Sequence, residues 1–164
     1  WCFSALMKKR KEHYTPGNDA TTRMSGRLRT LIEAIDPELH RRIYVVLLDN
    51  FTSPGFCWRW LHMLFVTQFR ASSVARLWDV LLADVNGIDE LLPFVSYACL
   101  ERLPIDWHEI GVDQLLKIGI EHFDEFDMES DDIKLVIVRA RELQIRHMSR
   151  HKLHADKRRS CVVA

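Results

Sequence analysis

The last four residues offer a definite chemistry, because Cys161-Val162-Val163-Ala164 has the form of a C-a-a-X box. Such a cysteine is a prenylation site, and alanine in the last position favours a farnesyl group. Three basic residues, Lys157, Arg158 and Arg159, stand just before it. One lipid chain gives only marginal membrane binding, and each basic residue near an anionic leaflet adds about 1 kcal/mol. The sequence therefore predicts a membrane-binding tail; the alternatives are an accidental ending or a cut chain.

Two other clusters have ligand-type side chains. His147, His151 and His154 share a helical face, but no acidic or cysteine ligand accompanies them in register, so we interpret them as part of an exposed basic face rather than a metal site. The stretch from Glu121 to Asp132 is strongly acidic, but it lacks the glycine that a calcium loop needs at its sharp turn. A solvated acidic loop is the better interpretation, and we expect neither a metal nor a cofactor.

Composition narrows the class of protein further. The chain has 164 residues, enough for one ordinary domain, and its net charge of zero gives no indication of nucleic-acid binding. Its four cysteines are scattered without a C-x-x-C motif, which fits a reducing cytosol better than a zinc site or a disulfide framework. No apolar run is long enough to span a bilayer. The chain begins at Trp1 inside an apolar pattern, so we expect it to be a piece of a longer protein.

The stretch from Phe56 to Asp84 must position the rest of the domain, since it is the richest in tryptophan and aliphatic residues. Residues 58–69 are apolar almost all the way round, which predicts a helix buried on most faces. Residues 74–85 show one apolar stripe at helical spacing, which predicts a second helix, and Ser72 or Ser73 is placed to cap its first turn.

Arg59 lies between two tryptophans of the first of these helices, and a guanidinium buried there needs an acceptor. Asp79 lies on the flank of the stripe of the second helix, so the two residues are candidates for an ion pair between the helices. The alternative is an exposed pair of Asp79 with Arg76, three residues earlier. Trp60 and Trp78 are predicted to pack in the core around this pair.

The remaining segments also show helical rather than strand patterns. Pro37 follows Asp36, an N-cap residue, and Asp89 is placed to cap a further helix. The basic run 8–11 is interpreted as a solvated helix end, and residues 15–26 as a loop. We expect helices over residues 2–13, 27–35, 37–50, 90–102 and 113–123 and from about 132 onward, with a connector at 106–111, and hence an all-α fold.

Three groups of residues carry a resemblance to a known family. Phe56-Cys57-Trp58-Arg59-Trp60-Leu61, then Leu64-Phe65, then Arg76-Leu77-Trp78-Asp79-Val80-Leu81 resembles the "F-x-x-R-W-L … L-F … R-L-W-D-x-L" run of TBC domains, the all-helical GTPase-activating domains for Rab GTPases. Asp36-Pro37-Glu38-Leu39 resembles the family's "D-P-E-L" segment. Trp1-Cys2-Phe3 with Leu6-Met7 resembles its "F-W-C-F … L-M" helix. The three matches occur in the family's order between Trp1 and about Leu103.

The resemblance implies a right-handed array of helices in which residues 1–123 form the C-terminal half of a TBC domain. Residues 124–153 would then be an acidic loop and a basic helix, and residues 154–164 the polybasic tail. The partner implied is a GTP-bound Rab GTPase, and the process is vesicle trafficking. In the family, the catalytic arginine and glutamine come from motifs before the F-W-C-F helix, so we assign no catalytic residue here. We expect the chain alone to be inactive: it is not an enzyme, but part of an activator of one.

Thr67-Gln68 departs from the family pattern, which often has Arg-Glu at this place. Two other interpretations stay open. One is a non-catalytic Rab-binding or scaffolding protein, and the other is a helical adaptor unrelated to Rab proteins. For a GTPase activator or a Rab-binding scaffold, the expected location is cytoplasmic, peripheral on the cytoplasmic face of a membrane.

Overall fold

The computed structural model describes residues 2–17, 20–43, 56–103, 105–111, 114 and 130–162, with the side chains at 2, 56, 130, 131 and 150–162 left aside. Within these ranges the chain is helical and forms no strand, so the all-α prediction is confirmed. The elements are α1 (Cys2–Lys9), the 3-10 helix η1 (Lys11–Tyr14), α2 (Ala20–Ile35), α3 (Pro37–Ile43), α4 (Phe56–Met63), α5 (Ala71–Ala83), α6 (Ile88–Arg102) and α8 (Ser130–Val162).

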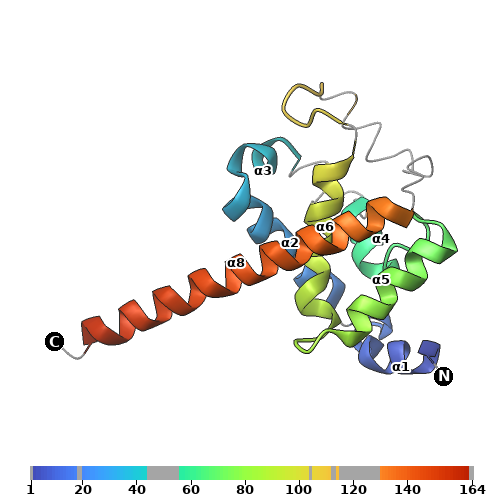
Figure 1. The fold of residues 1–164 in the computed structure, drawn as a ribbon, viewed down its shortest axis with the longest axis horizontal. Helices are drawn as coiled ribbons and strands as arrows, with labels where there is room; N and C mark the ends of the chain where they lie inside the picture. The colour runs from blue at the N-terminus through green and yellow to red at the C-terminus, as the bar shows by residue number, and fades with distance from the viewer. Residues whose placement is uncertain are drawn as a thin grey trace.

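Helix α6 lies at the centre of the molecule (Figure 1), in contact with α2, α4, α5 and α8. Every residue from Leu91 to Leu100 is buried, which requires neighbours on all sides of the helix. The hydroxyl of Ser96, in the middle of this stretch, donates a hydrogen bond to the carbonyl of Leu92 at 3.0 Å and so satisfies its donor. A helix that is apolar on all faces thus becomes the axis around which the others pack.

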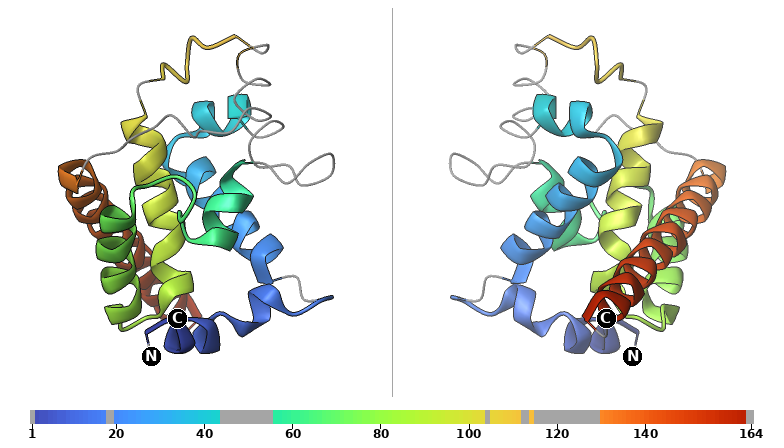
Figure 2. Two further views of the ribbon diagram at one scale, coloured as in Figure 1. Left: turned by 90° about the vertical axis from the view of Figure 1, so that its right-hand side faces the viewer. Right: turned by 90° about the vertical axis from the view of Figure 1, so that its left-hand side faces the viewer.

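Helix α8 crosses α6 on the outer side of the molecule, and the two-sided view shows α2 and α4 on the other side of α6 (Figure 2). Ile133, Val136, Ala140 and Leu143 are its buried residues toward α6 and α5. The helix was predicted to begin near Asp132, and it begins at Ser130. It continues well past the last of these core contacts.

Helix α4 ends earlier than predicted. We expected one helix over residues 58–69, but α4 stops at Met63, and Leu64 and Phe65 take left-handed backbone angles, with φ of 50° and 63°. Each left-handed residue costs about 1–2 kcal/mol. Both side chains are buried, and burial of a large apolar side chain contributes about 1.5–3 kcal/mol, which offsets that cost. The indole N–H of Trp78 donates to the carbonyl of Leu64 at 3.1 Å and holds the turn from α5.

The start of α2 also differs from the prediction, which placed a loop there. The helix begins at Ala20, and Ala20, Thr21, Met24 and Ser25 are buried on the face that continues to Leu28. Small and hydroxyl-bearing side chains occupy the core-facing positions of this first half. The apolar periodicity was therefore too weak in this segment to indicate a helix.

Of the predicted caps, one is confirmed and two are wrong. The Asp36 carboxylate accepts a hydrogen bond from the backbone N–H of Leu39 at 2.9 Å, and α3 begins at Pro37. Helix α5 instead begins at Ala71, with no side-chain hydrogen bond at its cap, so Ser72 and Ser73 lie within its first turn. Helix α6 likewise begins at Ile88, one residue before Asp89. The predicted segments 44–50 and 115–123 and the acidic loop 121–129 lie outside the described residues.

Candidate functional site

The most elaborate polar cluster of the described residues joins η1, α2, α4 and α6 around Arg10. This side chain is fully buried between α1 and η1, although the basic run 8–11 led us to predict a solvated helix end. The guanidinium donates to the Asp89 carboxylate and, through Nη2, to the backbone carbonyl of Leu61 at 2.6 Å. The prediction was wrong for Arg10, because an acceptor 79 residues further along the chain pairs with it.

His13 lies on the other side of the same carboxylate. Its Nε2–H donates to Asp89 Oδ2 at 3.0 Å, and its Nδ1 is hydrogen bonded to the Thr21 hydroxyl at 3.0 Å. The Thr21 hydroxyl is also 3.2 Å from Nδ1 of His62 on α4. A continuous chain of hydrogen bonds therefore runs from α6 through η1 and α2 to α4.

The electrostatics of this cluster follow from its geometry. Burial alone would raise the pKa of Asp89, but the hydrogen bond from His13 and the charge and hydrogen bond of Arg10 outweigh it and hold the pKa below its usual value. Burial lowers the pKa of His62, and the positive charges of Arg10 and His13 lower it further. The cluster thus favours one ionised carboxylate and disfavours a charge on His62.

An aromatic layer covers His62 on its outer side. The ring of Trp58 stacks on the His62 imidazole with centroids 4.4 Å apart, and the ring of Tyr14 meets it edge-on at 4.8 Å. The Tyr14 hydroxyl donates to the His62 carbonyl at 2.7 Å. The first tryptophan of the F-C-W-R-W-L motif therefore covers the polar cluster rather than packing in the core.

The second tryptophan of that motif, Trp60, is buried in the main core beside Phe65, as predicted. Trp78 is half-buried and packs on the edge of the core. Arg59 is also half-buried, whereas Asp79 is exposed. Among the described residues no ion pair joins Arg59 to Asp79; the buried arginine that pairs with an aspartate here is Arg10, and its partner is Asp89.

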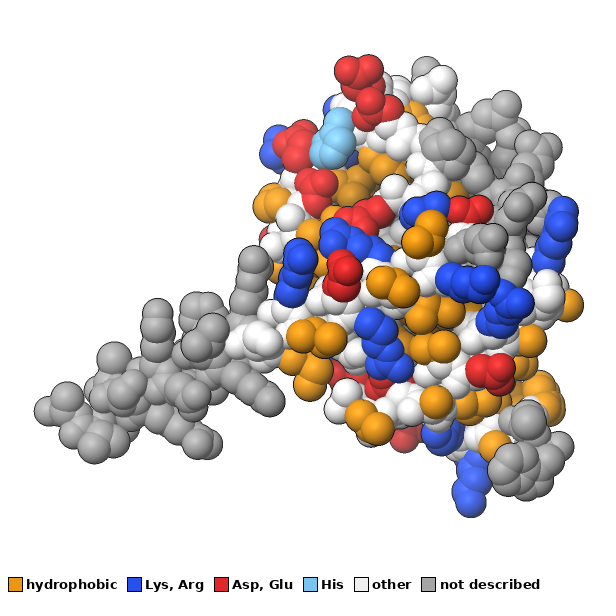
Figure 3. Space-filling model, viewed as in Figure 1, with side chains coloured by type: hydrophobic (Ala, Val, Ile, Leu, Met, Phe, Trp, Pro, Cys, Tyr) orange, Lys and Arg blue, Asp and Glu red, His pale blue; other side chains and the backbone are white. Residues whose placement is uncertain are grey.

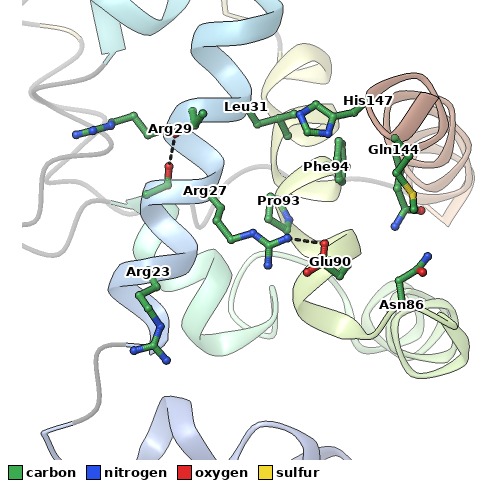
Figure 4. Close-up of a pocket in the computed structure, with 13 residues that line it drawn as sticks. Arg23, Arg27, Arg29, Leu31, Asn86, Glu90, Pro93, Phe94, Gln144 and His147 are labelled. Atoms are coloured by element: carbon green, nitrogen blue, oxygen red, sulfur yellow. Dashed lines mark hydrogen bonds and ion pairs between the residues drawn. The ribbon is translucent and has the colours of Figure 1, made fainter. Parts of the chain in front are cut away.

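A cleft of about 700 Å³ lies between α2, α6 and α8 (Figure 4). Leu31, Pro93, Phe94 and Met148 give it apolar walls, and the His147 ring meets the Phe94 ring edge-on at 5.6 Å. At its edge Arg27 reaches across from α2 and donates to Glu90 at 2.6 Å. Both of these side chains are about half exposed, which makes this an ordinary surface pair.

A buried carboxylate, that of Asp84, joins α8 to the end of α5. Asp84 Oδ2 accepts a hydrogen bond from Arg141, and Asp84 Oδ1 accepts one from the backbone N–H of Asn86 at 2.8 Å. Further along α8, Arg139 donates two hydrogen bonds to the Glu101 carboxylate, at 2.7 and 2.8 Å. These contacts hold α8 in one register against α5 and α6.

Within the described residues, no group of three or more histidine, cysteine and acidic side chains is arranged to bind a metal ion. His147 contacts Phe94, and the side chains of His151 and His154 lie outside the description. None of the described helices combines the length and the apolar character that crossing a membrane requires. The predicted tail site, Cys161 with Lys157, Arg158 and Arg159, falls on the last turns of α8, where only the backbone is described.

These features define an all-α domain in which helices packed around α6 are joined by a buried arginine–aspartate–histidine cluster. The profile of the Rab-GTPase-TBC domain family matches residues 1–106, and the chain belongs to that family. The match covers α1 to α6, including the tryptophan motifs and the Arg10 cluster.

Curated relatives agree with the family match. The chain is 30% identical over 146 residues to human TBC1 domain family member 17, covering 87% of the chain and 21% of that protein. It is 24% identical over 141 residues to GTPase-activating protein gyp1 of Schizosaccharomyces pombe, covering 85% of the chain and 27% of that protein. With gyp7 of the same yeast it shares 33% identity over 103 residues, which are 62% of the chain and 13% of that protein. The chain thus spans about a quarter or less of these relatives, and no solved structure gives a significant match.

Proposed function

We propose that the chain is the C-terminal part of a GTPase-activating domain for Rab GTPases in a longer protein, and that it acts there as a scaffold. The observation that carries this proposal is the family match over α1 to α6, together with relatives named as GTPase-activating proteins. In this reading the protein binds a GTP-bound Rab and contributes to the control of vesicle trafficking.

The scaffold role follows from where the family keeps its catalytic groups. An arginine that stabilises the transition-state charge contributes about three to five orders of magnitude in rate. The family's arginine and glutamine belong to motifs that precede the F-W-C-F helix, to which residues 1–7 correspond. The buried arginine of this chain, Arg10, has its charge neutralised by Asp89 inside the fold, so it is not placed to enter a partner's active site.

The experiment that tests this function is a single-turnover assay of GTP hydrolysis with a panel of GTP-loaded Rab proteins. The protein that carries the upstream motifs should accelerate hydrolysis by at least one Rab, and the 164-residue chain alone should accelerate none. Acceleration by the chain alone would show that a catalytic group lies within these residues. Binding of a Rab without acceleration by the longer protein would favour the second candidate, a non-catalytic Rab-binding scaffold.

We also propose that the tail attaches the protein to the cytoplasmic face of a membrane through a prenyl group on Cys161. The adjacent Lys157, Arg158 and Arg159 supply the second signal that a single lipid chain needs. Cys161→Ser should lower the share of the protein in the membrane fraction of cells and raise its share in the cytosolic fraction. Ser160→Ala, one residue earlier, is the matched control and should leave the distribution unchanged. Equal membrane fractions for the two variants would remove the lipid anchor from the proposal.

A further inference from the structure

Helix α8 carries two apolar faces instead of one. The inner face, described above, packs on α5 and α6. At 100° of rotation per residue, a second set lies on roughly the opposite side of the helix. These outward side chains are Leu135, Val138 and Ile145, with exposed fractions of 52%, 56% and 63%. A surface helix ordinarily has one apolar stripe facing the core. The outward set, here called the outer row, therefore needs a different explanation.

Single exposed apolar residues are common on protein surfaces, but a row along about three turns of one helix is not. Three of the nine large apolar side chains that are exposed in the described part of the chain belong to the outer row. Figure 3 shows this face of the molecule, where apolar, basic and acidic side chains lie interspersed. Such a row indicates a surface that is covered when the protein functions.

The charge around the outer row indicates what covers it. The segment from Ser130 to Val162 contains nine Lys and Arg but four Asp and Glu, a net charge of +5, whereas the whole chain is neutral. Lys134 and Arg146 are exposed. Of the described side chains on this face, Glu142 is acidic, and its carboxylate lies 3.6 Å from Arg139. Arg139 and Arg141 also pair with Glu101 and Asp84, so the excess positive charge lies with Lys134, Arg146 and the residues of α8 beyond Met148.

This combination fits an anionic lipid bilayer better than a second copy of the chain. Pairing two such helices would bring two segments of like charge together, which is unfavourable. A helix with exposed apolar side chains and basic neighbours instead lies in the membrane interface, with its apolar face in the headgroup–acyl boundary and its cations near the lipid phosphates.

We propose that the outer row and the basic residues beside it form a docking surface for anionic membranes. This surface adds to the proposed lipid tail and does not depend on it, because Leu135 to Ile145 lie in the folded part of the chain. Since α8 is continuous to Val162, a helix docked in the plane of the membrane places Cys161 about 24 Å from Ile145 along the same surface. The docking surface would then fix the orientation of the domain on the membrane.

The test uses the unprenylated 164-residue chain in a flotation assay with vesicles that contain phosphatidylserine and with neutral phosphatidylcholine vesicles. The variants are Ile145→Glu on the outer row and Val66→Glu, its matched control, on an exposed side chain in the connection between α4 and α5. Circular dichroism melts establish that both variants fold. Ile145→Glu should weaken binding to the anionic vesicles at least about tenfold, which corresponds to about 1.4 kcal/mol. Val66→Glu should bind like the unaltered chain.

Equal binding by the two variants, or no preference of the unaltered chain for anionic vesicles, would overturn the proposal. A dimer that Ile145→Glu dissociates, without vesicle binding, would assign the face to self-association instead. The Rab assay above is carried out in solution without vesicles, so its result is independent of this one. If the chain does not bind anionic vesicles but the longer protein activates a Rab, the docking surface alone is overturned.

Discussion

Replacing Asp89 by asparagine should destabilise the domain by about 2–3 kcal/mol, although its side chain is 44% exposed. The substitution keeps the shape but removes the charge that faces the buried Arg10. Two unit charges 4 Å apart interact by about 4 kcal/mol at an effective dielectric constant of 20. We reduce this value because the carboxylate is partly screened by solvent. The remaining loss lies near the lower end of what breaking a buried pair costs, about 3–5 kcal/mol.

The neighbouring residue supplies a closely matched control. Glu90 also lies in the first turn of α6 and also pairs with an arginine, Arg27, at 2.6 Å. Both substitutions, Asp89→Asn and Glu90→Gln, remove one negative charge from the same helix N-terminus, so they lose the same interaction with the helix dipole. The difference is that Arg27 is 45% exposed and Arg10 is buried. We expect Glu90→Gln to cost under about 1 kcal/mol.

Urea unfolding followed by tryptophan fluorescence measures both costs, since Trp60 and Trp107 are buried in the folded state. The free energy of unfolding should fall by at least about 1 kcal/mol more for Asp89→Asn than for Glu90→Gln. Equal costs for the two variants would refute the reasoning, because burial of the arginine would then make no difference. Arg10→Met combined with Asp89→Asn should cost less than the sum of the two single variants, as expected for directly coupled residues.

Three further outcomes are expected. The pKa of His62 is lower in the folded chain than in the unfolded chain, so the unfolded chain takes up a proton first as pH falls through 6.5. The free energy of unfolding should therefore decrease as pH falls through this range. His62→Gln should flatten this pH dependence in urea titrations carried out at a series of pH values. Trp78→Phe should cost about 1 kcal/mol in the same measurement, because the carbonyl of Leu64 loses its donor; no loss would show that water replaces it. Arg141→Gln should lower the free energy of unfolding by about 2–3 kcal/mol, because the buried Asp84 carboxylate loses its cation. A decrease under about 1 kcal/mol, which is typical of a surface pair, would contradict this.

Features that depend on neighbours along the chain were predictable from the sequence. The helix start at Asp36-Pro37 needs a capping carboxylate three residues before the N–H it binds, and that spacing is visible in the sequence. The family also followed from residue patterns, and the match over residues 1–106 confirms it. The buried faces of α5 and α8 follow the periodicity of their aliphatic residues.

The polar cluster was not predictable in this way, because its members are far apart along the chain. Arg10 stands in a run of cations that is typical of a solvated helix end, while Asp89 stands where a helix cap is common. Neither position shows periodicity that connects the two. Arg59, between two tryptophans, had the more conspicuous sequence context, yet burial depends on which elements meet in space. The left-handed turn at Leu64 and Phe65 was missed for a similar reason, since it is stabilised by core packing and by Trp78 from the next helix.

The hydrogen bond from Arg10 to Asp89 has a consequence for the order in which the domain is completed during its synthesis. Ribosomes add about 5–20 residues per second, so the 79 residues between donor and acceptor take about 4–16 s to make. Throughout that time Arg10, between α1 and η1, lacks the Asp89 carboxylate that neutralises its charge. The segment around Arg10 therefore reaches its final position only after α6 has been synthesised, and a chaperone acting on this protein would meet the segment before that ion pair has formed.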